Sequence, residues 1–105
     1  MTTISTVAVI GAGQMGVGIA HVVALGGYRV RLYDLAPERL PLAMGAIAAA
    51  MARQVGRGDL DQTGADAALA RIETTPELAT AAAADLVIEA AVEDEAVKKS
   101  VFADL

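Results

Sequence analysis

Two short runs of apolar residues have the pattern of strands buried in a parallel sheet. They are residues 6–10 (TVAVI), which end directly at Gly11, and residues 86–90 (LVIEA). Continuous apolar runs of this length, bounded by turn residues, are typical of strands covered on both faces. Residues 28–33 (YRVRLY) alternate between apolar and charged positions, which predicts a strand nearer the sheet edge. A brief fourth strand is expected at residues 72–75.

Helical periodicity fills the segments between these strands. Apolar residues recur at near 3.6-residue spacing over residues 15–25, and the pair Gly26 and Gly27 supplies the stop that helices favour. Pro41 has no backbone N–H to donate, so we expect the next helix to start near it and to run to about Val55. The connection that follows contains two further glycines.

The second half of the chain continues the alternation of helices and strands. Thr63 and Asp66 have the spacing of a capping box, which predicts a short helix. An alanine-rich helical turn is expected at residues 76–84, and another helix at residues 95–105. This order of elements is typical of a doubly wound parallel sheet. The predicted fold is therefore α/β, the N-terminal part of one Rossmann-type domain over residues 1–105.

The most informative motif lies where the first strand meets the first helix. It matches the pattern GxGxxG, and its residues are Gly11, Ala12, Gly13, Gln14, Met15 and Gly16. Glycines at these positions let the chain turn tightly, bring backbone amides close to a pyrophosphate and let the helix pack against the strand. The amides and the positive end of the helix dipole would meet the charge of a dinucleotide.

An acidic residue at the end of the second predicted strand completes the motif, because Asp34 follows Gly16 by 18 residues. A carboxylate there accepts hydrogen bonds from both hydroxyls of the adenosine ribose and repels a 2′-phosphate. No arginine stands directly beside Asp34 in the sequence, so NAD is the predicted cofactor rather than NADP. Two alternatives stay open: the glycines could serve strand–helix packing alone, and Asp34 could be a solvated acid.

Composition and charge narrow the range of functions. The 105 residues fit a single domain. Eight Lys and Arg against 13 Asp and Glu give a net charge of −5, which argues against a nucleic-acid partner. The absence of cysteine excludes disulfides and thiolate metal sites and favours a cytoplasmic protein. Residues 1–28 carry no Asp, Glu, Lys or Arg, but their glycines argue against a membrane segment.

These motifs together resemble the N-terminal domain of the 3-hydroxyacyl-CoA dehydrogenase family over essentially the whole chain. The residues that carry the resemblance are 11–20 (GAGQMGVGIA), Asp34, 85–90 (DLVIEA), Glu93 and Lys98. The resemblance implies that the glycine motif binds the NAD pyrophosphate and that Asp34 binds the adenosine ribose. It also implies that Glu93 and Lys98 contact the nicotinamide end. Arg57, after the long helix, is the nearest match to a basic residue that touches coenzyme A in this family.

The resemblance further implies an oxidoreductase of fatty-acid metabolism that transfers hydride between the 3-hydroxyl carbon of an acyl-CoA and NAD. The family's catalytic serine, histidine, glutamate and asparagine belong to later motifs that this chain does not contain. We therefore expect the cofactor-binding part only, with no catalytic or metal-binding residue, from an enzyme that forms homo-oligomers. His21, the only histidine, is expected to pack within its helix. The alternatives are a related carnitine or gulonate dehydrogenase and a non-catalytic NAD-binding or sensing module.

Overall fold

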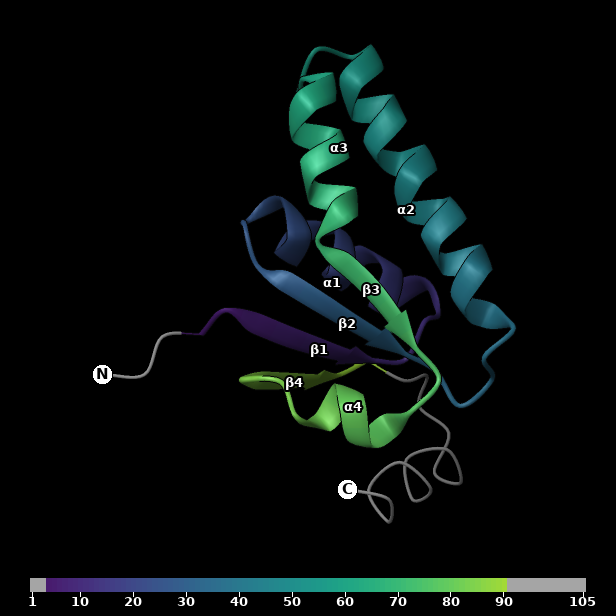
Figure 1. Cartoon of the computed structure of the whole chain (residues 1–105). Helices are drawn as coiled ribbons and strands as arrows, with labels where there is room; N and C mark the ends of the chain where they lie inside the picture. The colour runs from purple at the N-terminus through teal and green to yellow at the C-terminus, as the bar shows by residue number, and fades with distance from the viewer. Residues whose placement is uncertain (1–3, 91–105) are drawn as a thin grey trace.

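The computed structural model describes residues 4–90, in which four parallel strands form one sheet (Figure 1). The strands are β1 (Thr6–Ile10), β2 (Arg29–Tyr33), β3 (Ile72–Thr75) and β4 (Leu86–Glu89). Their order across the sheet is β3-β2-β1-β4. The helices are α1 (Gln14–Leu25), α2 (Arg39–Gly56), α3 (Gln62–Ala70) and α4 (Leu78–Ala82). The predicted α/β fold with a doubly wound parallel sheet is confirmed.

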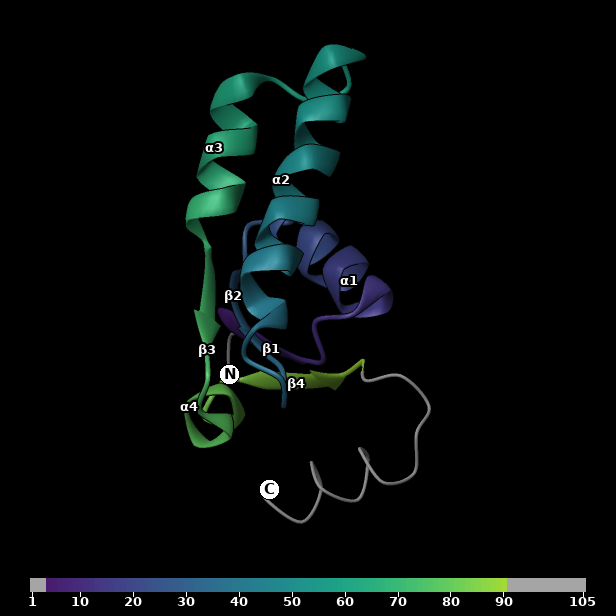
Figure 2. The same ribbon diagram turned by 90° about the vertical axis from the view of Figure 1, so that its right-hand side faces the viewer.

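The helices divide between the two faces of the sheet: α1, α2 and α3 cover one face and α4 the other (Figure 2). The larger core lies between the sheet and the three helices, and its fully buried side chains include Val9, Val30, Leu32 and Ile47. A smaller core joins α4 to β1 and β2. Within residues 4–90, none of the helices combines the length and the apolar character needed to cross a bilayer.

The fully buried face of α1 consists of small residues, while larger apolar residues such as Ile19 and Val23 pack against the core from partly buried positions. Gly16, Ala20 and Ala24 are the buried residues of this helix and recur every fourth position. Met15 and Val22, which belong to the predicted apolar pattern, are 64% and 69% exposed. The periodicity therefore predicted the helix correctly, but the face that packs on the sheet is the one that allows the closest approach.

Gly16 is the point of closest approach between α1 and the end of β1. A Cβ built on Gly16 would overlap the carbonyl oxygen of Gly11 and would lie 2.8 Å from its carbonyl carbon. Real Cβ atoms do not approach backbone atoms this closely, so a larger residue would push the helix away from the strand. Gly18, on the same helix, has open space around its Cβ position.

Two predicted helix starts differ from the structure. α2 begins at Arg39, two residues before Pro41. Pro41 is accommodated because amides in the first turn have no partner within the helix, so the missing N–H costs nothing there. α3 is capped by Asp61, whose Oδ1 accepts a hydrogen bond from the Gly64 amide at 2.6 Å, and not by Thr63. The expected helix at residues 95–105 lies outside the described residues.

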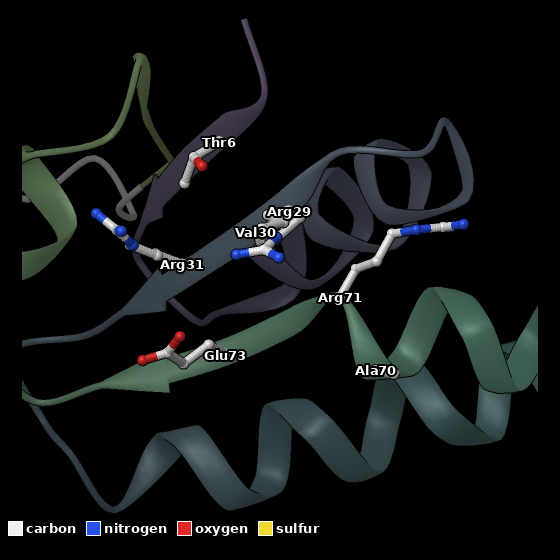
Figure 3. Close-up of a pocket in the computed structure, with 7 residues that line it drawn as sticks. All are labelled: Thr6, Arg29, Val30, Arg31, Ala70, Arg71 and Glu73. Atoms are coloured by element: carbon white, nitrogen blue, oxygen red, sulfur yellow. The ribbon is translucent and has the colours of Figure 1, made fainter.

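The positions of two strands also correct the sequence interpretation. β2 is an inner strand of the described sheet, paired with β1 on one side and with the outer strand β3 on the other. Its charged face is tolerated because α4 is only five residues long and leaves a hollow of about 290 Å³ over the amino ends of the strands, lined in part by Arg29, Arg31 and Glu73 (Figure 3). β4, predicted to be fully buried, pairs only with β1 within residues 4–90, and Leu86 and Val87 are 43% and 36% exposed.

Asp85 joins the start of β4 to the start of β1. Its Oδ2 accepts hydrogen bonds from the Ser5 amide at 2.9 Å, the Ser5 hydroxyl at 3.0 Å and the Thr6 amide at 3.0 Å. These bonds, that of the Ser5 amide first, hold the pKa of Asp85 below its usual range because they favour the charged carboxylate. The contact therefore fixes the amino end of β4 against the amino end of β1.

We expect the substitution Gly16→Ala to destabilise the fold by at least about 2 kcal/mol, because the added methyl group meets backbone atoms that cannot move aside. The matched control is Gly18→Ala, which we expect to be neutral or stabilising by up to about 1 kcal/mol, since alanine favours helices and the site is open. Urea denaturation of both variants measures the difference. Equal stability of the two variants would show that α1 is free to shift.

Asp85 also predicts how stability depends on pH. Because its pKa is lower in the folded chain, the stabilisation is present above the ordinary aspartate pKa of about 3.9 and is lost as the pH falls through the folded value. We expect Asp85→Asn to flatten the loss of stability between about pH 5 and pH 3. Ser5→Ala, which removes only the hydroxyl donor, should have a smaller effect. Urea midpoints over this range test the prediction, and parallel curves for Asp85→Asn and the parent would contradict it.

Candidate functional site

The glycine motif and Asp34 lie side by side at the carboxyl ends of β1 and β2. Ile10, the last residue of β1, pairs with Tyr33, the last residue of β2. Gly11 and Asp34 are the next residues on each strand. Open parallel sheets bind ligands in the crevice outside their carboxyl ends. The structure thus brings the two predicted parts of the site together.

The glycine motif bends from strand to helix as predicted. Gly11 has φ of 114°, a backbone conformation that residues with a side chain rarely adopt. Its amide donates a hydrogen bond to the Tyr33 carbonyl at 2.7 Å, which continues the contact between β1 and β2 beyond the last strand pair. Gly13 is extended and forms the N-cap of α1. The chain therefore enters α1 directly above the strand ends.

The amino end of α1 offers backbone donors for an anion. The first amides of any helix have no acceptor within it. Among residues 4–90 no side chain caps this helix, and its first turn contains no acidic residue. Gln14 and Met15 in that turn are exposed. These donors, together with the positive end of the helix dipole, suit a pyrophosphate group in a chain whose net charge of −5 supplies no attraction at long range.

Asp34 is 6% exposed, and both of its carboxylate oxygens accept backbone hydrogen bonds. Oδ2 accepts from the Ala12 amide at 2.7 Å, and Oδ1 accepts from the Ala36 amide at 2.8 Å. The carboxylate is therefore held in one orientation against the glycine motif and is not a freely solvated acid. Each carboxylate oxygen has about two acceptor positions, so capacity remains for ribose hydroxyls.

Arg39 stands next to Asp34, which the sequence analysis missed. Its Nη1 lies 4.0 Å from Asp34 Oδ1, with the arginine side chain 59% exposed and the aspartate side chain 8% exposed. No arginine was expected near Asp34 because none is adjacent to it in the sequence. That expectation was wrong, since the fold brings Arg39 close to the carboxylate. The sequence could have indicated this neighbour. Proline is tolerated in the first turn of a helix, so α2 could have been expected to start before Pro41, at Arg39.

Arg57 lies far from the glycine motif, at the outer end of the hairpin formed by α2 and α3 (Figure 1). It is the C-cap of α2, whose 18 residues span about 27 Å. Its Nε donates to Asp59 Oδ2 at 3.1 Å, and both side chains are about three-fifths exposed, at 62% and 61%. The predicted contact with coenzyme A thus falls on a different part of the molecule from the crevice.

Three further residues were singled out in the sequence: His21, Glu93 and Lys98. The structure describes only the first of them. His21 Nε2 and Gln54 Oε1 form a hydrogen bond of 2.7 Å between α1 and α2, so His21 has the packing role that was expected. Glu93 and Lys98 lie outside the described residues. Across residues 4–90, no group of three or more His, Asp or Glu side chains is placed to hold a metal ion.

Comparison with known proteins gives the family. Residues 6–105 match the family described as 3-hydroxyacyl-CoA dehydrogenase, NAD binding domain. The chain is 47% identical over 102 residues to a 3-hydroxybutyryl-CoA dehydrogenase of Bradyrhizobium diazoefficiens, covering 97% of this chain and 35% of that protein. It is 46% identical over 105 residues to a 3-hydroxyadipyl-CoA dehydrogenase of Escherichia coli, covering all of this chain and 22% of that protein.

A solved structure agrees with these sequence matches. The crystal structure of a 3-hydroxybutyryl-CoA dehydrogenase from Escherichia coli K12 superposes with a TM-score of 0.88 at 45% identity, covering 97% of this chain and 22% of that one. The chain therefore spans about a third or less of the length of these relatives. Since the family match extends over nearly every residue, the chain belongs to the NAD-binding domain family of the 3-hydroxyacyl-CoA dehydrogenases.

Proposed function

We propose that this chain is the NAD-binding part of an enzyme that transfers hydride between the 3-hydroxyl carbon of a 3-hydroxyacyl-CoA and NAD. The observation that carries the proposal is the pairing of uncapped amides at the start of α1 with an oriented carboxylate, Asp34, at adjoining strand ends. The names of the relatives, which are dehydrogenases of 3-hydroxybutyryl-CoA and 3-hydroxyadipyl-CoA, support the substrate class.

In this proposal the glycine motif and Asp34 bind different parts of the cofactor. The amides from Gly13 to Gly16 would bind the pyrophosphate, since they lie at the positive end of α1. Asp34 would accept hydrogen bonds from the adenosine ribose, and its bonds to Ala12 and Ala36 keep its orientation before the ligand arrives. The nicotinamide ring, when bound, accepts or donates the hydride, and the role of this chain is to place the ring.

Three further assignments belong to the same proposal. Glu93 and Lys98 follow β4 in the sequence and would contact the nicotinamide end, as the family resemblance implies. Arg57, exposed at the outer end of the α2–α3 hairpin, would contact the phosphates of coenzyme A, which arginine binds well. Catalytic residues and the contacts that form a homo-oligomer would come from the part of the enzyme that this chain does not include.

We expect this chain to bind NAD more tightly than NADP and Asp34→Asn to weaken NAD binding about tenfold, because the amide loses the charge that strengthens hydrogen bonds from ribose hydroxyls. Asp66→Asn, an exposed position on α3, is the matched control. Isothermal titration calorimetry gives the affinities, and circular dichroism confirms folding. Absence of NAD binding to the unsubstituted chain would reject the proposed function, and an unchanged affinity in Asp34→Asn would remove Asp34 from the site.

The assignment of Arg57 is tested separately, with steady-state kinetics of the full-length enzyme. We expect Arg57→Ala to raise the KM for a 3-hydroxyacyl-CoA by about three- to tenfold through the loss of a phosphate contact at an exposed site. The affinity for NAD should stay the same, since the hairpin end lies far from Asp34. Arg53→Ala, in the last turn of α2, is the control for loss of charge. Equal KM values in the two variants would exclude a specific contact by Arg57.

A further inference from the structure

Arg39 occupies the solvent side of the carboxylate that is assigned to the adenosine ribose. Its Nη1 faces Asp34 Oδ1 at 4.0 Å, which is an ion-pair distance but too long for a hydrogen bond. The donors of Asp34 are the backbone amides of Ala12 and Ala36, at 2.7 and 2.8 Å. The guanidinium group is 59% exposed and thus keeps its own donors available for another acceptor.

The place of Arg39 in its helix brings its charge to the carboxyl ends of the strands. Arg39 is the first residue of α2, at the positive end of the helix dipole, where a cation is unfavourable. The N-cap residue directly before it is Glu38, whose side chain makes no capping hydrogen bond, and the first turn itself contains no acidic residue. Arg39 thus has an acidic neighbour in Glu38 and an acidic partner in Asp34, and its exposed guanidinium group adds positive charge beside the proposed ribose position. α2 starts beside the carboxyl ends of β1 and β2 (Figure 1).

The two charged side chains have opposite effects on a phosphate at the ribose. NAD presents a 2′-hydroxyl there, which a carboxylate accepts, whereas NADP presents a 2′-phosphate, which a carboxylate repels. A guanidinium group binds phosphate through two parallel hydrogen bonds. Because the Arg39 side chain is largely exposed and its Nη1 lies 4.0 Å from Asp34 Oδ1, the ion pair is weak and leaves most of the carboxylate charge in place, so NAD stays preferred.

We propose that Arg39 is a specificity-determining residue that can bind a 2′-phosphate. The charge of Asp34 opposes this binding, and Arg39 sets how strongly the chain discriminates against NADP. The inference rests on the proposed function, since it takes the adenosine ribose to lie at Asp34. One substitution at Asp34 is then enough to turn the site toward NADP, because the phosphate-binding arginine is already in place.

The test compares four variants by calorimetry with NAD, NADP and adenosine 2′,5′-bisphosphate, the last of which isolates the ribose phosphate. Asp34→Ser keeps a short hydroxyl acceptor and removes the charge, so we expect NADP to bind about tenfold more tightly than in the unsubstituted chain. The double variant Asp34→Ser with Arg39→Ala should lose this gain. Arg39→Ala alone should raise the ratio of NAD to NADP affinity about fivefold or more. Arg53→Ala, on the same helix, should leave that ratio unchanged.

The possible results separate the inference from the function on which it rests. If the unsubstituted chain binds neither dinucleotide, the proposed function fails. If it binds NAD but the gain in Asp34→Ser persists without Arg39, the function stands and the role of Arg39 is overturned. Should Asp34→Ser fail to fold, as judged by circular dichroism, Arg39→Ala in the otherwise unsubstituted chain decides the question, because an affinity ratio equal to that of Arg53→Ala contradicts the proposal.

Discussion

The close approach of α1 to the end of β1 is the constraint on which the rest of the structure depends. Gly16 lies against the Gly11 carbonyl with no room for a Cβ, and Ala20 and Ala24 continue this small face along the helix. The approach places the first amides of α1 directly above the carboxyl ends of the strands. A bulkier face would hold the helix farther out, and those amides would lie farther from the strand ends and from Asp34.

Asp34 links the glycine motif before α1 to the chain that follows the neighbouring strand. Its carboxylate binds the amide of Ala12 in the glycine motif and the amide of Ala36 in the chain that leads to α2. A buried carboxylate beside an anion-binding helix end looks electrostatically unfavourable. The two backbone donors offset its charge locally, while in the proposed binding mode the dipole of α1 acts on the pyrophosphate, so an acidic side chain and an anionic cofactor are compatible at this end of the sheet.

The elements that surround the crevice serve separate tasks. Arg31 donates to the Thr80 carbonyl at 2.9 Å and so connects β2 to α4. Arg71, the C-cap of α3, donates to the Ala24 carbonyl at 2.8 Å and so connects α3 to α1. His21 and Gln54 connect α1 to α2, whose far end bears Arg57, away from the proposed cofactor site. Arg39 alone among these groups has a charged partner at the proposed ribose position. Binding of a dinucleotide by an acidic protein would therefore depend on local groups at the strand ends and not on an overall positive surface.

The sequence by itself determined the features that depend on neighbouring residues along the chain. Apolar runs predicted the strands and periodicity predicted the helices. The spacing of Gly11, Gly13, Gly16 and Asp34 predicted the candidate site, because steric limits at a tight turn act on a few adjacent residues. Tertiary structure decided which face of α1 is buried and that β2 is an inner strand. It also decided that Asp85 accepts hydrogen bonds from Ser5 and that Arg39 lies beside Asp34. These contacts arise when separate segments pack at a fixed distance, and no local pattern records that distance.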